Sequence, residues 1–68
     1  MTEQITGTIT ALDLERRIAF LRVSEQKRRT ELYFGPELSQ RIRNCFGAVV
    51  TLSGQWIYET FDVWKIGK

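Results

Sequence analysis

The sequence predicts a small all-β protein with one helix, in the element order β-β-β-α-β-β. Several short segments alternate apolar and polar residues with a period of two, which is typical of half-buried strands. One segment, residues 35–47, instead repeats apolar residues every three or four positions, as an amphipathic helix does. The 68 residues are 43% hydrophobic and 26% charged, a balance that favours a folded domain over a disordered chain. We therefore expect residues 1–68 to form a single domain.

The first half of the chain predicts three strands. Residues 5–12, ITGTITAL, are rich in β-branched residues, and their alternation places Ile5, Gly7, Ile9 and Ala11 on one face. Residues 13–16 then form a loop. A second strand is predicted over residues 17–23 and a third over residues 29–34, joined by the polar stretch at 24–28.

Residues 35–47, GPELSQRIRNCFG, predict the helix. Gly35 suits the N-cap, and Pro36 suits the first helical position, where no backbone hydrogen bond is lost. Gly47 can end the helix in the left-handed conformation. One face of this helix collects the apolar residues that we expect to plug the core: Leu38, Ile42, Cys45 and Phe46.

The last two strands are predicted over residues 48–58 and 61–66. Gly54 indicates a bulge or bend in the first of them, and Glu59-Thr60 is a weak turn signal between them. A small barrel needs large side chains to fill it, so we expect Trp56 and Trp64 in the core. In the last strand, Phe61 and Val63 are then the exposed pair.

This layout resembles the OB-fold, a five-stranded Greek-key barrel named for binding oligonucleotides and oligosaccharides. The resemblance covers residues 5–66 and includes the opening ITGTITALD, with Gly7 where the first strand must curl. In size and layout the chain is similar to bacterial translation initiation factor one, from which it departs in its better capped helix and more mixed charge. The alternative is an SH3-like barrel, which usually carries only a short 3₁₀ turn between its last two strands. The helix after the third strand argues against it.

In OB-folds, the outward face of the second and third strands commonly receives the ligand. The better core sets are Ala19, Leu21 and Val23 in one strand and Thr30, Leu32 and Phe34 in the other. Two aromatic and two cationic side chains then point outward: Phe20, Arg22, Arg29 and Tyr33. The opposite parity would bury Ile18 and Phe20 and remove this platform.

Basic residues are concentrated around this face. Six of them fall within residues 16–29, which contain a single acid, Glu25. Such a stripe attracts phosphate even though the net charge is only +2. The candidate nucleic-acid-binding residues are therefore Phe20, Arg22, Lys27, Arg28, Arg29 and Tyr33. Glu31 lies in the middle of the same face and would repel phosphate.

The sequence has few of the residues that catalysis or metal binding commonly uses, so we expect a non-enzymatic protein with no cofactor and no metal. The chain has no histidine, and its one cysteine, Cys45, can build neither a disulfide framework nor a structural zinc site. The N-terminal residues lack a signal-peptide pattern, and no apolar run could span a membrane. These features favour a reducing, cytoplasmic setting and no membrane partner.

Two functions from different classes fit these observations. The first is a binding module for single-stranded nucleic acid or structured RNA, in which Phe20 and Tyr33 stack on bases and the cations contact phosphate. The second is a protein-interaction or regulatory barrel that docks on a partner protein or self-associates, which the nearly balanced charge favours.

Overall fold

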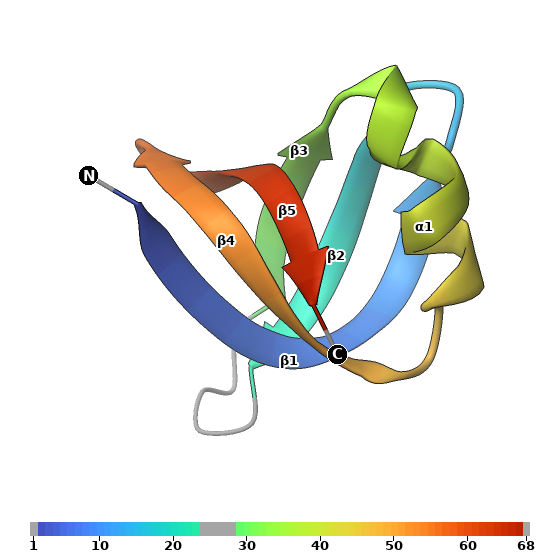
Figure 1. The fold of residues 1–68 in the computed structure, drawn as a ribbon, viewed down its shortest axis with the longest axis horizontal. Helices are drawn as coiled ribbons and strands as arrows, with labels where there is room; N and C mark the ends of the chain where they lie inside the picture. The colour runs from blue at the N-terminus through green and yellow to red at the C-terminus, as the bar shows by residue number, and fades with distance from the viewer. Residues whose placement is uncertain (1, 24–28, 68) are drawn as a thin grey trace.

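The computed structural model describes residues 2–23 and 29–67, which form a five-stranded closed barrel with one short helix (Figure 1). The strands are β1 (Glu3–Asp13), β2 (Ile18–Val23), β3 (Arg29–Phe34), β4 (Val49–Ile57) and β5 (Thr60–Gly67). Between β3 and β4 lie a 3₁₀ turn, η1 (Pro36–Leu38), and the helix α1 (Ser39–Asn44). The predicted fold class and element order are confirmed.

Neighbouring strands follow the order β1-β2-β3-β5-β4, and β1 also pairs with β4 to close the barrel. Among the strand pairs of the described residues, only β3–β5 is parallel. The long strand β1 makes closure possible because its first half pairs with β4 and its second half pairs with β2. A register shift between Ile9 and Ala11 bends the strand where these two pairings meet.

This shift corrects the predicted faces of β1. Ile9, before the shift, is fully buried. Thr10 is the extra residue of the bulge, so alternation restarts beyond it: Ala11 pairs with the outward Phe20, and Leu12 pairs with the buried Ala19 and packs against the core. The prediction that Ala11 shares a face with Ile5, Gly7 and Ile9 was wrong, because an extra residue reverses every later side chain.

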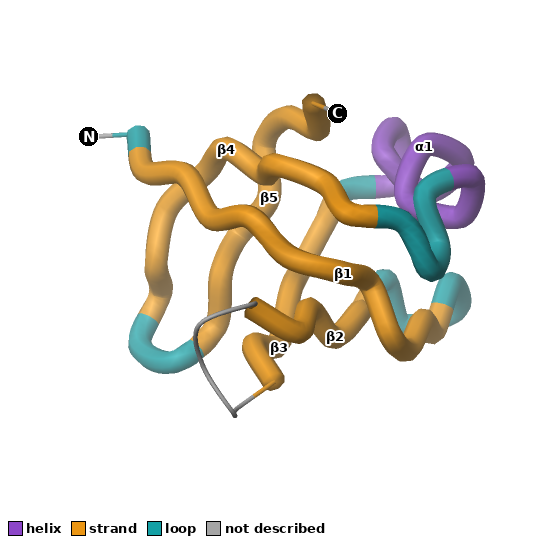
Figure 2. Tube along the Cα trace, turned by 90° about the horizontal axis from the view of Figure 1, so that it is seen from below, coloured by secondary structure: helices purple, strands orange, loops and turns teal. Residues whose placement is uncertain are grey.

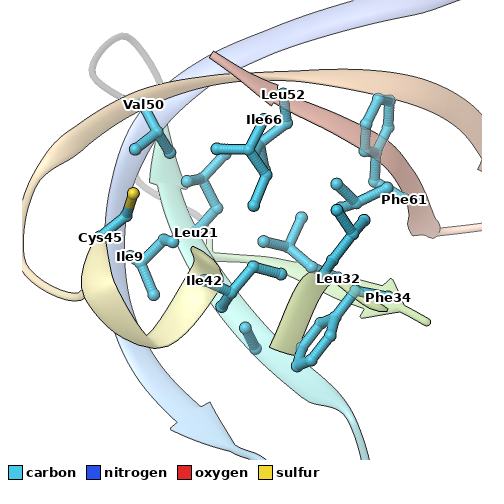
Figure 3. Close-up of a cluster of buried hydrophobic side chains, with 13 residues drawn as sticks. Ile9, Leu21, Leu32, Phe34, Ile42, Cys45, Val50, Leu52, Phe61 and Ile66 are labelled. Carbon is cyan, nitrogen blue, oxygen red and sulfur yellow. The ribbon is translucent and has the colours of Figure 1, made fainter. Parts of the chain in front are cut away.

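The helical segment closes one end of the barrel, as predicted, and Figure 3 shows Ile42 and Cys45 directed into the cluster of strand side chains. It is shorter than the predicted helix, since η1 replaces its first turn and α1 ends at Asn44. Phe46 lies beyond that end and is 53% exposed, so its predicted place in the core was wrong. Gly47 has the expected positive φ of 83°, and its N–H donates to the Ile9 carbonyl at 2.9 Å.

The residues of β5 that are buried differ from those predicted. Phe61 and Val63 are buried, whereas Trp64 is 48% exposed. The reason is a second register shift: Ser53 pairs with Lys65 and Gly54 pairs with Val63, which leaves Trp64 without a partner. Gly54 was correctly predicted as the site of an irregularity. Its consequence, that Val63 and Ile66 both point inward although three residues apart, was missed.

The prediction for Trp56 was also wrong, for a different reason. Trp56 pairs with Phe61 and so shares the inner face of the sheet, but it lies near the end of the barrel and is 41% exposed. Its ring meets Phe61 edge-on, with centroids 5.1 Å apart and an interplanar angle of 76°. The β4–β5 turn comes one residue earlier than predicted: Ile57 pairs with Thr60, and Tyr58 takes a positive φ of 57°.

Candidate nucleic-acid interface

The predicted parity of β2 and β3 is confirmed. Five of the six predicted inner residues are buried: Ala19, Leu21, Thr30, Leu32 and Phe34. The sixth, Val23, is partly buried and packs against the core. On the outer face, cross-strand pairs join Ile18 to Tyr33, Phe20 to Glu31, and Arg22 to Arg29. Phe20 and Tyr33 are therefore diagonal neighbours on adjacent strands, and Glu31 lies directly opposite Phe20 and two residues before Tyr33.

Phe20 is outward but only partly buried, because neighbouring side chains cover it. The guanidinium carbon of Arg29 lies 5.0 Å from the centroid of the Phe20 ring, within the range of a cation–π interaction. On the other side, Phe20 pairs with the small Ala11 of β1, and the Thr10 hydroxyl donates to the Phe20 carbonyl at 3.4 Å. Phe20 and Arg29 thus form one unit, in which the cation already occupies part of the ring face.

Tyr33 supplies the more open aromatic surface, since 43% of it is exposed. It pairs with Asp62 of the parallel strand β5, and the Asp62 carboxylate accepts a hydrogen bond at 3.1 Å from the indole N–H of Trp64. Trp64 therefore lies on the outer surface near Tyr33. Sequence reasoning missed it because the alternation of β5 assigned it to the core, and Gly54 was the one signal that could have revealed the bulge.

The cations of the site are unevenly placed. Arg22 and Arg29 are both exposed and face each other directly across β2 and β3. Like charges at directly opposite positions destabilise a sheet, and a bound anion would relieve that repulsion. The two loop cations predicted for the site, Lys27 and Arg28, lie outside the described residues.

The outer face also carries acid. Glu31 lies between the two aromatic residues, as the sequence indicated, and Asp62 adds a second carboxylate that was not predicted. Both reduce the positive potential available to a phosphate. Within residues 2–23 and 29–67, no three His, Cys, Asp or Glu side chains lie close enough together to hold a metal ion. In the same residues, no helix is long and apolar enough to cross a membrane.

Comparison of the chain with known proteins gave no match to a family model, to a curated protein or to a solved structure.

Proposed function

We propose that this protein is a non-enzymatic binding module for single-stranded nucleic acid or structured RNA. The observation that carries the proposal is the Arg22–Arg29 pair: the two residues are directly opposite across β2 and β3, and the Arg29 guanidinium lies against the ring of Phe20. Such a pair is unfavourable in the free protein and favourable around an anion. Phosphate of a nucleic-acid backbone is an anion that also brings bases for the adjacent aromatic rings.

In this proposal Tyr33 stacks on one base, because nearly half of its surface is open. A base near Phe20 meets the Arg29 guanidinium as well as the ring, and guanidinium planes also stack on bases. Arg22 contacts phosphate. Each stacked base contributes about 1–3 kcal/mol and carries little sequence information, so binding is sequence-tolerant on this face.

The test is a fluorescence-anisotropy titration of labelled single-stranded RNA and DNA at about 50 mM and about 200 mM salt. Affinity falls steeply between the two if phosphate contacts contribute. Tyr33→Ala weakens binding by about 1–3 kcal/mol. Phe46→Ala is the control, because Phe46 is also an exposed aromatic residue but lies just beyond α1, outside β2 and β3. Absence of saturable binding at low salt would exclude the proposal.

A second function, protein interaction or self-association, is favoured by a different observation. Phe46, just after α1, and Val49, the first residue of β4, are 53% and 62% exposed, although both are large and apolar. Exposed apolar groups of this kind mark contact surfaces in many proteins. Light scattering distinguishes the two functions: a dimer that Phe46→Ala dissociates supports the second, and a monomer that binds oligonucleotide supports the first.

A further inference from the structure

A groove of about 440 Å³ opens beside the proposed site and is not explained by it. Its volume lies within the usual range of small-molecule pockets. The start of β3 and the β4–β5 turn frame it, and Figures 1 and 2 both place that turn on the side of the barrel opposite α1. The residues that line it are Phe20, Arg29, Thr30, Glu31, Trp56, Glu59 and Thr60.

Two aromatic rings from strands that are not neighbours, β2 and β4, meet at this groove. Phe20 contributes its ring together with the guanidinium of Arg29. Trp56 contributes an indole whose edge contact with Phe61 fixes it and which remains 41% exposed. A planar ligand that enters the groove therefore finds the Trp56 indole on one element and the Phe20 ring with its Arg29 guanidinium on another, and both kinds of group stack on bases.

The polar groups of the groove then select among bases. Glu31 and Glu59 carry carboxylates, which only accept hydrogen bonds when ionised. The Watson–Crick edge of guanine presents two adjacent donors, N1–H and the 2-amino group, which match the two oxygens of one carboxylate. Uracil and thymine present two carbonyl oxygens that flank a single N–H, and those oxygens would face the carboxylate unfavourably.

A cationic ligand fits the groove less well, although two carboxylates and two aromatic rings could suggest one. The guanidinium of Arg29 already lies over Phe20, so a second cation would meet a like charge. A neutral donor-rich base avoids this repulsion and leaves Arg29 free to contact its phosphate.

We propose that this groove holds one guanine base of a bound single strand, with Glu59 reading its Watson–Crick edge and Glu31 and Trp56 completing the pocket. The inference rests on the proposed function and deepens it. The β2–β3 face supplies sequence-tolerant affinity, and the groove adds a preference for guanine at one position.

The experiment compares a labelled ten-nucleotide oligouridine with the same oligonucleotide carrying one central guanosine. The guanosine raises affinity for the wild-type protein about tenfold, as expected of a good two-bond base contact. Glu59→Gln abolishes that preference and leaves the affinity for oligouridine unchanged or higher, because it removes a negative charge. Glu37→Gln is the control: Glu37 is an exposed carboxylate in η1, and the same loss of charge there preserves the preference.

Each other outcome overturns the inference in a recognisable way. Equal affinity for the two oligonucleotides, or a preference that survives Glu59→Gln, removes the guanine pocket and leaves the proposed function intact. No binding of either oligonucleotide removes both. If neither oligonucleotide binds, and an arginine-rich peptide binds in a manner that Glu59→Gln abolishes, the groove is a cation site of a protein-interaction module.

Discussion

Two aromatic residues on β2 and β3 differ in how much of their surface the fold leaves available. Tyr33 is open, whereas Phe20 is enclosed by Ala11 on one side and Arg29 on the other. The alternation of the strand determines that both point outward. It does not determine how far each is covered, since that depends on residues from a neighbouring strand. Phe20 therefore contributes to stability as well as to the surface.

This distinction predicts different costs for truncating adjacent residues of β2. Phe20→Ala lowers the free energy of unfolding by about 1–2 kcal/mol, through partial burial and the lost cation–π contact. Leu21→Ala lowers it by about 2–5 kcal/mol, because Leu21 is fully buried. Urea denaturation of both variants measures the difference. Equal losses would mean that Phe20 belongs to the core and that no binding platform exists on this face.

The strands β1 and β5, which flank the proposed site, each contain a β-bulge. The bulge at Thr10 turns Ala11 outward against Phe20, and the bulge at Trp64 allows Val63 and Ile66 both to face inward while Trp64 stays outward. Without the extra residue in β1, the outer surface would lose the small neighbour that accommodates Phe20. Strand pairing and the site are therefore linked at the level of whole elements.

The β5 bulge depends on Gly54, which faces Val63 where the register shifts. A methyl group at Gly54 would collide with the Asp62 carbonyl oxygen and lie 3.2 Å from the Phe61 ring. Gly54→Ala therefore lowers the free energy of unfolding by about 1–3 kcal/mol, as overpacking does.

Gly67→Ala is the control for that substitution, because the nearest atom to its added methyl, the Thr51 carbonyl oxygen, is 3.8 Å away. It should change stability by less than about 0.5 kcal/mol. Thermal melts followed by circular dichroism compare the two variants. Equal melting temperatures of the two variants would show that the close approach of β4 and β5 at Gly54 does not contribute to stability.

At the scale of the whole molecule, the helix and the proposed site occupy different parts of one barrel. The helical segment seals one end of the core with Leu38, Ile42 and Cys45 (Figures 1 and 3). The outward faces of β2, β3 and β5 carry the exposed Arg22, Tyr33 and Trp64. The formal net charge of +2 is too small to drive tight binding by itself. Placement of the cations therefore matters more than their number.

Two variants test whether binding depends on where the cationic residues lie or only on how many there are. Arg22→Ala and Arg43→Ala each remove one positive charge, from the proposed face and from α1 respectively. Arg22→Ala should make the slope of log affinity against log salt shallower by about 0.7, the value expected for one lost contact to a single strand. Arg43→Ala should leave that slope unchanged. Equal effects in oligonucleotide titrations would indicate a diffuse charge attraction without a site.

The sequence by itself determined the five strands and the helical segment in their order along the chain, Gly47 with its positive φ, and the parity of β2 and β3. These depend on local periodicity and capping, which the chain carries wherever it folds. Tertiary structure alone decided that Trp64 faces out, that Phe61 and Val63 fill the core, and that Ala11 lies beside Phe20. Each of these follows from a register shift between paired strands, and a shift is fixed by cross-strand packing and barrel closure. The groove that joins Phe20 to Trp56 is likewise absent from any local pattern, because closure alone brings β2 and β4 to the same end of the barrel.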